Sequence, residues 1–125
     1  MSPWTDRELQ TIDHADELRI SSSRADGTVT RPVTIWAVRV GDQVYVRSVR
    51  GRGAGWFTST QATGTGHVSI GGIEKDVTFA EVSSPAEQDA ISHAYQAKYN
   101  RYAQSIVDSI LTPDALAATI KASPH

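Results

Sequence analysis

The sequence predicts a mainly β protein with helices, of the α+β class: a small antiparallel β-barrel with one helix near its N-terminus and further helices near its C-terminus. Five β-rich runs precede residue 83, and glycine-containing dipeptides suited to tight hairpin turns separate most of them. A capping-box pattern on each side of this region marks the start of a helix. The 125 residues suffice for one core and are too few for two, so we expect a single domain over residues 1–125.

The N-terminal segment predicts a short helix followed by the first strand. Thr5 and Glu8 form a capping box, in which the threonine side chain accepts from the backbone of Glu8 and the glutamate reaches back. Leu9 and Ile12 are then spaced to face the core. Alternation of polar and apolar residues over 17–20 predicts the strand.

A long strand is predicted over residues 33–40. It follows a turn cluster that ends in Asp26-Gly27. Pro32 lacks a backbone donor, so the strand begins at or just after Pro32, or else Pro32 sits on an exposed edge. Neither side of the strand is plainly polar, which is typical of a barrel strand with one face inside the barrel and the other covered by a helix or a second subunit. Gly41-Asp42 suits a tight turn into an antiparallel strand over residues 43–48.

The middle of the chain predicts a helical or irregular segment and a second hairpin. Residues 53–63 lack strand alternation, and we expect Trp56-Phe57 to anchor a short helical turn or loop there. Gly71-Gly72 then joins strands over residues 67–70 and 73–82, because glycine adopts positive φ without steric cost.

The C-terminal third predicts helices and a closing strand. Ser84 and Glu87 form the second capping box, with proline at the first helical position. Thr112 is typical of a further helix cap, and residues 118–122 of a short strand. An apolar stripe runs between the two caps, and we expect it to pack in the core. The alternative is that its tyrosines line a pocket. The stripe consists of Ile91, Tyr95, Tyr99, Tyr102, Ile106 and Ile110.

Positive charge is concentrated in the middle of an acidic chain. Residues 24–52 hold six arginines against two aspartates, a local charge of +4, whereas the whole chain carries −2. Arg47, Arg50 and Arg52 lie beside glycines that let the backbone approach a ligand, and guanidinium groups suit phosphate or carboxylate. This pattern indicates a localised anionic ligand. The alternative is that these arginines point outward from strands and are simply solvated.

Other function classes find little support in the sequence. There is no cysteine, hence no disulfide, thiolate nucleophile or cysteine metal site, and the four histidines lack metal-ligand spacing. No Gly-x-Ser-x-Gly elbow is present. Apolar runs such as residues 35–38 are too short to span a bilayer, and the first residues do not resemble a signal peptide. We therefore expect a cytoplasmic protein with no membrane partner.

Aromatic, glycine and charged positions spread along nearly the whole chain form a recognisable set. They are Trp4, Glu8, residues 16–20, Ile35-Trp36, Val38, residues 45–48, Gly51, Trp56, Ala94-Tyr95, Lys98-Tyr99 and Thr119. In these positions the chain resembles a family known as a domain of unknown function, DUF2255.

A second resemblance is confined to residues 24–56, where a basic hairpin leads into a strand, a glycine turn and a tryptophan. The positions concerned are Arg24, Gly27, Arg31, Pro32, Ser48, Gly51, Gly53 and Trp56. In this pattern the segment is similar to the split β-barrel flavin and deazaflavin (F-420) reductases. It departs from them in having proline directly after Arg31, and Phe57-Thr58-Ser59 where an asparagine usually follows the tryptophan.

That resemblance implies a split, FMN-binding-like barrel and an oxidoreductase that uses FMN or coenzyme F-420. Hydride transfer would belong to the cofactor, so no catalytic side chain is assigned. Arg47, Ser48, Arg50 and Arg52 would hold the cofactor phosphate, and Trp36 or Trp56 would border its ring system. The complete candidate cofactor-binding set is Arg31, Trp36, Arg47, Ser48, Arg50, Gly51, Arg52 and Trp56.

Two other functions remain open at this point. The same arginines could bind a small anionic ligand in a barrel without redox function. An arginine and tryptophan surface could also bind single-stranded nucleic acid, although the net negative charge and the lack of a lysine-rich stripe disfavour it. We further expect a homodimer, because the doubly apolar strand and the aromatic stripe exceed what one small barrel can cover.

Overall fold

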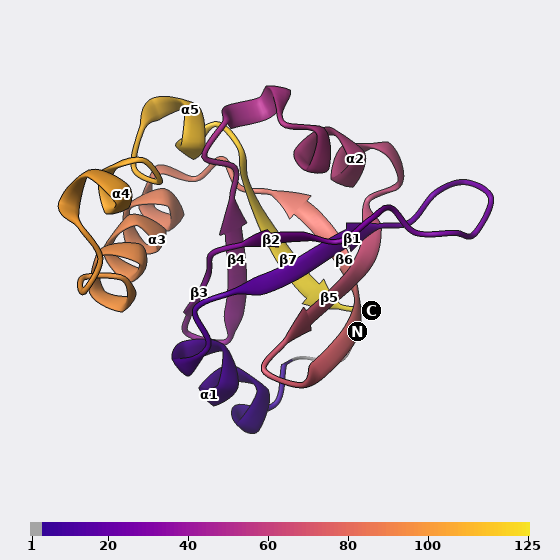
Figure 1. The fold of residues 1–125 in the computed structure, drawn as a ribbon, viewed down its shortest axis with the longest axis horizontal. Helices are drawn as coiled ribbons and strands as arrows, with labels where there is room; N and C mark the ends of the chain where they lie inside the picture. The colour runs from indigo at the N-terminus through magenta and orange to yellow at the C-terminus, as the bar shows by residue number, and fades with distance from the viewer. Residues whose placement is uncertain (1–3) are drawn as a thin grey trace.

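The computed structural model describes residues 4–125, which form a seven-stranded sheet and several helices (Figure 1). The strands are β1 (Leu18–Ser22), β2 (Val33–Ile35), β3 (Ala37–Val40), β4 (Gln43–Arg47), β5 (Thr65–Ile70), β6 (Ile73–Glu81) and β7 (Thr119–Pro124). The helices are α1 (Asp6–His14), the 3-10 turn η1 (Gly51–Gly53), α2 (Gly55–Thr63), α3 (Pro85–Lys98), α4 (Gln104–Asp108) and α5 (Pro113–Leu116).

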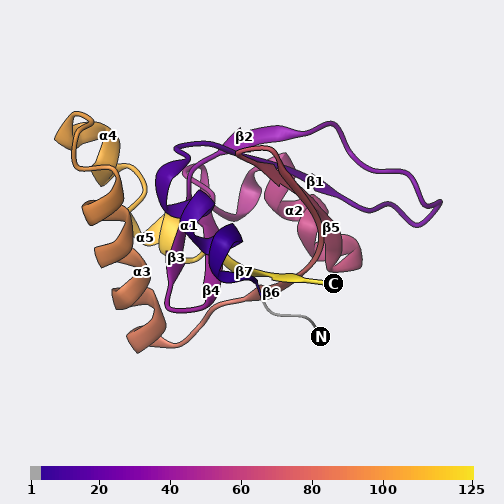
Figure 2. The same cartoon turned by 90° about the horizontal axis from the view of Figure 1, so that it is seen from below.

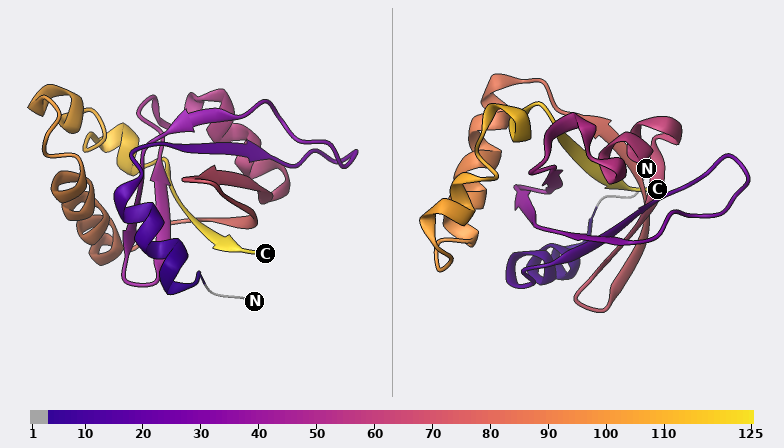
Figure 3. Two further views of the ribbon diagram at one scale, coloured as in Figure 1. Left: turned by 60° about the horizontal axis from the view of Figure 1, so that its bottom comes forward. Right: turned by 45° about the horizontal axis from the view of Figure 1, so that its top comes forward.

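The sheet is antiparallel throughout and curls into a nearly closed barrel. Its strand order is β2-β1-β5-β6-β7-β4-β3, so the two ends of the sheet are β2 and β3. These two strands are consecutive in the chain and are separated only by Trp36. The views in Figure 3 show the sheet curling round on itself. The predicted antiparallel barrel is confirmed.

The predicted single strand over residues 33–40 is wrong, because the chain breaks it at Trp36. Ile35 pairs with Leu18 of β1, whereas Ala37 pairs with Val46 of β4. One straight strand cannot pair with both ends of the curled sheet, so the chain leaves the ladder for one residue and changes direction. The described part of the chain therefore has six strands before residue 83, one more than predicted.

Side chains from α3 and from Tyr99, the residue that follows it, replace the ladder hydrogen bonds that the break removes. The Tyr95 hydroxyl donates to Trp36 O at 3.2 Å, and the Tyr99 hydroxyl accepts from Ala37 N at 3.2 Å. Lys98 Nζ donates to Ala37 O at 2.6 Å. Because buried backbone groups must be paired, these three polar side chains stabilise the change of direction.

The β3–β4 hairpin is buried on both faces. Val44 and Val46 lie in the core inside the barrel, whereas Val38 and Tyr45 lie in a second core against α3. Figure 2 shows α3 and α4 standing together beside this part of the sheet. The expectation that a helix or a second subunit covers the outer face is met by a helix of the same chain.

The helix starts follow the predicted caps. Thr5 makes both bonds of its capping box, and Leu9 and Ile12 are buried as predicted. Ser84 caps α3, but within the described residues the second bond of its predicted capping box is not made, and the Glu87 carboxylate instead accepts from the Tyr45 hydroxyl at 2.8 Å. Thr112 caps α5.

The apolar stripe of the C-terminal third does not form one helix. Helix α3 ends at Lys98, and α4 begins only at Gln104. The prediction that Ile106 is a core residue is wrong, because its side chain is 48% exposed. Helix α4 buries Val107 in the core next to α3, whereas Ile106 faces a cleft described below.

A long connection between β1 and β2 extends from the barrel. Figures 1 and 2 show it projecting on the side opposite α3 and α4. Gly27 makes its turn with a φ of 87°, and Arg24 N donates to Thr28 O at 2.7 Å. The predicted turn at Asp26-Gly27 is thus present, at the tip of a longer arm.

Candidate functional site

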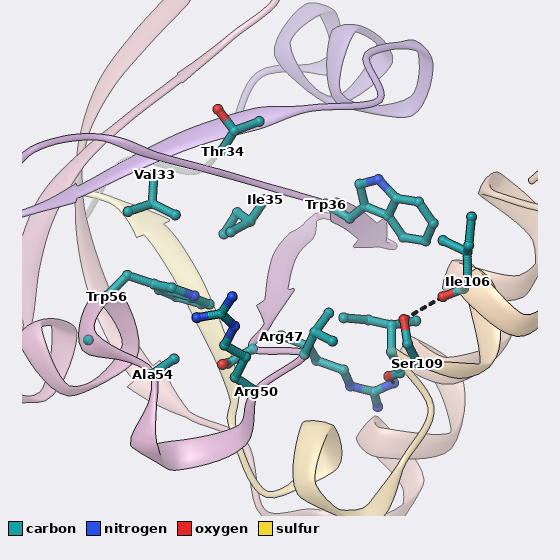
Figure 4. Close-up of a pocket in the computed structure, with 14 residues that line it drawn as sticks. Val33, Thr34, Ile35, Trp36, Arg47, Arg50, Ala54, Trp56, Ile106 and Ser109 are labelled. Atoms are coloured by element: carbon teal, nitrogen blue, oxygen red, sulfur yellow. Dashed lines mark hydrogen bonds between the residues drawn. The ribbon is translucent and has the colours of Figure 1, made fainter.

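A cleft of about 570 Å³ opens beside the break at Trp36 (Figure 4). This volume is within the usual range of pockets for small ligands and cofactors. Strand β2, the end of β4, the start of α2 and the segment around α4 enclose it. The lining residues are 33–36, 47–50, 54–56, Ile106, Ser109 and Ile110.

The structure brings five of the eight predicted site residues together in this cleft. They are Trp36, Arg47, Ser48, Arg50 and Trp56. The other three, Arg31, Gly51 and Arg52, do not line it. The three clustered arginines of the sequence therefore have three different environments.

Arg47 is a buried cation whose hydrogen-bond donors are all used within the protein. Its side chain is 1% exposed, and its five N–H groups have five protein acceptors. These acceptors are Thr119 Oγ1, Ser92 Oγ, Ile110 O, Gln88 O and Gln88 Oε1, at 2.7–3.3 Å. No donor is left for the phosphate contact that the sequence predicted.

Arg47 nevertheless contributes charge to the cleft. Burial lowers its pKa, but a guanidinium stays protonated in proteins. Among residues 4–125 it has no carboxylate within ion-pair distance. Its positive charge is thus uncompensated at the base of the cleft, where a low dielectric strengthens the attraction for an anion.

Ser48 has the opposite situation, with a buried hydroxyl and no partner. Its side chain is 1% exposed, and within the described residues Oγ has no hydrogen-bond partner. A buried polar group without a partner costs on the order of 1–3 kcal/mol. Because Ser48 lines the cleft, a ligand there is the natural acceptor or donor for this hydroxyl.

Two further groups at the same end of the cleft favour the binding of an anion. Arg50 is exposed, and within residues 4–125 it makes neither an ion pair nor a hydrogen bond through its side chain. Figure 4 shows its guanidinium extending into the cleft on the side of Trp56. Helix α2 begins here with Ala54 as N-cap, and within residues 4–125 no side chain caps its first N–H groups. We call Ser48, Arg50 and the first turn of α2 the anion end of the cleft.

Gly51, Arg52 and Arg31 have other surroundings. Gly51 turns the chain after β4 with a φ of 76°, and a Cβ at this position would lie 3.3 Å from Asp114 Cβ. Arg52 pairs with Glu81, donates to Ala117 O at 2.9 Å and lies over the Phe57 ring. Arg31 is exposed on the arm before β2. The first has a structural role, and the other two lie outside the cleft.

Two tryptophans form the aromatic walls. The Trp36 ring stacks on Tyr99 with centroids 3.9 Å apart and planes 5° apart, so one face of the indole is fixed by α3. Trp56 is half-buried and contacts Phe57 edge-on at 6.0 Å. Figure 4 shows the two indoles on different walls of the cleft.

Sequence reasoning missed the contributions of α4 and of the α2 N-terminus. Ile106 and Ser109 line the cleft only because the helix is interrupted after Tyr99. The polar pair Asn100-Arg101 was the available signal, since asparagine is a weak helix former. The start of α2 carried no signal, because alanine is a poor N-cap.

The described residues do not provide what a metal site requires. Residues 4–125 contain no group of three or more His, Cys, Asp or Glu side chains placed to hold a metal ion. His67 lies between Asp76 and Glu74, at 3.0 Å from each, on the β5–β6 hairpin. No helix in residues 4–125 has the length and hydrophobicity needed to cross a membrane.

A family model matches most of the sequence. The model described as "Uncharacterized protein conserved in bacteria (DUF2255)" covers residues 8–122. No curated protein has a matching sequence. This match confirms the first resemblance found in the sequence.

Solved structures share the fold at low sequence identity. An F420-H2 dependent reductase (FDR-A) superimposes with a TM-score of 0.65 at 15% identity, covering 86% of this chain and 94% of that one. The heme storage protein HutZ from Vibrio cholerae gives 0.64 at 9% identity, covering 99% and 92%. An FAD-binding protein from Mesorhizobium loti gives 0.57 at 14% identity, covering 97% and 88%. The split-barrel fold is thereby confirmed.

Proposed function

The chain belongs to the DUF2255 family of bacterial proteins, and from this premise and the geometry of the cleft we propose that it binds FMN or the deazaflavin coenzyme F-420 and serves as a reductase. One observation carries the proposal: the cleft is lined by both the buried Ser48 hydroxyl and the Arg50 guanidinium, and neither group has a partner among the described residues. The flavin- and deazaflavin-binding proteins of the same fold support the ligand class.

The anion end of the cleft would hold the ligand phosphate. Ser48 Oγ would gain its missing partner, Arg50 would supply a charge-assisted bond, and the uncapped N–H groups of α2 would complete the cradle. Arg47 would act at a distance through its charge, since its donors are engaged. This division of roles replaces the sequence-based assignment of all four residues at 47, 48, 50 and 52 to phosphate.

The aromatic walls would hold the ring system. A bound flavin or deazaflavin would supply the hydride transfer. Trp36, fixed by its stacking on Tyr99, would orient the ring, and the apolar side chains Ile35 and Ile110 would limit water around it. These residues position the ligand and need no acid or base of their own.

A heme ligand is less well supported, although HutZ has the same fold. The residues that line the cleft, all within the described range, include no histidine, cysteine, methionine or tyrosine. These are the usual axial ligands of heme iron. The composition of the cleft therefore favours a ligand that is bound through phosphate and stacking.

Titration of the purified protein tests the proposal. We expect FMN or F-420 to quench tryptophan fluorescence, and Ser48→Ala and Arg50→Ala each to weaken FMN binding roughly 10- to 100-fold, as expected for loss of a bond to a charged group. Riboflavin, which lacks the phosphate, should bind wild type and Arg50→Ala equally. Arg31→Ala is the matched control and should bind like wild type.

The outcomes separate the ligand from the residues assigned to it. Absence of quenching by either cofactor would overturn the proposed function. Binding that is weakened equally by Arg31→Ala and Arg50→Ala would overturn the assignment of the anion end while leaving the ligand class intact.

A small anionic ligand without redox function is the second candidate. The anion end does not depend on the aromatic walls, and Arg47, which has no ion pair among residues 4–125, attracts any anion in the cleft. Stabilisation by phosphorylated metabolites, with no effect of FMN or F-420, would favour this candidate. Single-stranded nucleic acid ranks below both, because Arg39 and Arg52 are paired with Asp13 and Glu81 and form no continuous basic groove with Arg50.

A further inference from the structure

Trp36 is the first member of an aromatic cluster that leads from the cleft toward the surface. Its ring stacks on Tyr99 at 3.9 Å and lies 5.1 Å from Tyr102 at an angle of 42°. Tyr99 is fully buried, whereas Tyr102 is only half-buried and lies beneath the exposed guanidinium of Arg101. The cluster therefore has one member in the cleft and one that solvent can reach.

The two tyrosines differ in what their hydroxyl groups contact. The Tyr102 hydroxyl donates to Asp16 Oδ2 at 2.8 Å, a carboxylate that can accept a proton. The Tyr99 hydroxyl donates to the backbone oxygen of Asp16 at 2.6 Å, which cannot act as a base under ordinary conditions. Hydrogen bonding from Arg101 lowers the pKa of Asp16, so this carboxyl group is ionised at neutral pH.

This difference matters because a tyrosine is readily oxidised only if its phenolic proton can leave. Tyr102 has an acceptor for that proton and Tyr99 has none of comparable strength. Among the described residues, the aromatic contact of Trp56, the other tryptophan of the cleft, is Phe57, which has no phenolic proton to lose. Trp36 therefore contacts a tyrosine that can release its proton, whereas Trp56 contacts a phenylalanine.

We propose that Trp36, Tyr102 and Asp16 form a route for one-electron oxidation that moves an oxidising equivalent from the cleft to the surface of the protein. A one-electron oxidant in the cleft, such as a photoexcited flavin, takes an electron from Trp36, which becomes a radical cation while the flavin becomes its radical anion. Trp36 then takes an electron from Tyr102 and is restored. The Tyr102 proton passes to Asp16, leaving a neutral tyrosyl radical and a protonated carboxyl group.

The position of Tyr102 near the surface indicates what this route does for the protein. A radical left on Trp36 lies beside any bound ligand, where it can form covalent products. A radical on Tyr102 lies near the surface, where a soluble reductant can return the electron. The route protects the cleft and its ligand from oxidative damage.

Flash photolysis with tris(bipyridine)ruthenium(III) as the oxidant tests the route without any need for a ligand in the cleft, so its outcome is independent of the proposed function. In wild type we expect a tryptophanyl radical whose decay matches the rise of a neutral tyrosyl radical. Tyr102→Phe should abolish the rise and prolong the tryptophanyl radical at least about tenfold. Asp16→Asn should slow the transfer, because the amide cannot accept the proton.

Two matched controls distinguish this route from general oxidation. Tyr45 also donates to a carboxylate, that of Glu87 at 2.8 Å, but its ring is not among those in contact with Trp36, so Tyr45→Phe should leave the kinetics unchanged. Trp36→Phe should remove the coupled phase, whereas Trp56→Phe should retain it. A coupled phase that survives in Tyr102→Phe, or one that is lost only in Trp56→Phe, would overturn the proposal.

Discussion

Arg47 joins four parts of the molecule through one side chain. From the end of β4 it reaches Thr119 of β7, Gln88 and Ser92 of α3, and the backbone of Ile110. We expect Arg47→Met to lower the free energy of unfolding by about 2–4 kcal/mol, because buried acceptors lose their donors. Urea denaturation measures this change. Arg52→Met, which removes an exposed ion pair, is the control and should change little.

Ser48 should behave in the opposite way. Its buried hydroxyl has no partner among the described residues, so Ser48→Ala removes an unfavourable group from the unliganded protein. We expect the variant to be as stable as wild type or up to about 1 kcal/mol more stable in urea, even though its affinity for FMN falls. A clear loss of stability would show that the hydroxyl has a partner within the protein, and its assignment to a ligand would fail.

Lys98 should make stability depend on pH. Its Nζ donates to Ile12 O and Ala37 O, and burial lowers its pKa from 10.5 to about 8. Between these two values the unfolded chain holds a proton that the folded chain has lost, so stability rises with pH. The unfolding free energy of wild type should therefore increase relative to Lys98→Met from about pH 8 to about pH 10. A constant or falling difference would contradict the burial of this charge.

The sequence located the site but could not assign roles within it. Arg47, Arg50 and Arg52 look equivalent beside their glycines. Their differences arise from partners far along the chain, such as Gln88 for Arg47 and Glu81 for Arg52. Only Arg50 has no such partner among the described residues, and no local pattern indicates which of the three is free.

At the scale of elements, local signals were predicted well and long-range ones were not. The caps at Thr5, Ser84 and Thr112 depend on residues three positions away and were all confirmed. The break at Trp36 depends on closure of the whole barrel, so the run of residues 33–40, which is apolar except for Thr34 and Arg39, gave no sign of it. The helix interruption after Tyr99 was missed because the apolar stripe continues across it.

The stability of the break at Trp36 should depend on the hydroxyl of Tyr99. That hydroxyl accepts from Ala37 N and donates to Asp16 O, both of which would lose their partner in Tyr99→Phe. We expect a loss of about 1–3 kcal/mol in the free energy of unfolding. Hydrogen exchange at the Ala37 amide should also become faster. Tyr102→Phe is the control and should leave that exchange rate unchanged, because the Tyr102 hydroxyl donates to the Asp16 carboxylate and not to the backbone at the break.

At the scale of the whole molecule, the structure changes the reason to expect a dimer. The outer face of β3 and β4 is covered by α3, so the doubly apolar strand needs no second subunit. Exposed apolar side chains gather elsewhere, because three of the four large ones in the described chain line the cleft. These three are Val33, Val49 and Ile106, exposed by 36%, 52% and 48%.

We therefore predict a homodimer that buries the rim of the cleft. Apolar side chains of this kind are stabilised when removed from water, and an interface there would also enclose a ligand between two copies. Light scattering at micromolar concentration should report a dimer, and Ile106→Asp should shift it to monomer without loss of folding, because this side chain lies outside the core. Val29→Asp, on the projecting arm and 49% exposed, is the matched control and should remain dimeric. A wild-type monomer, or a dimer that only Val29→Asp disrupts, would place the interface elsewhere or remove it.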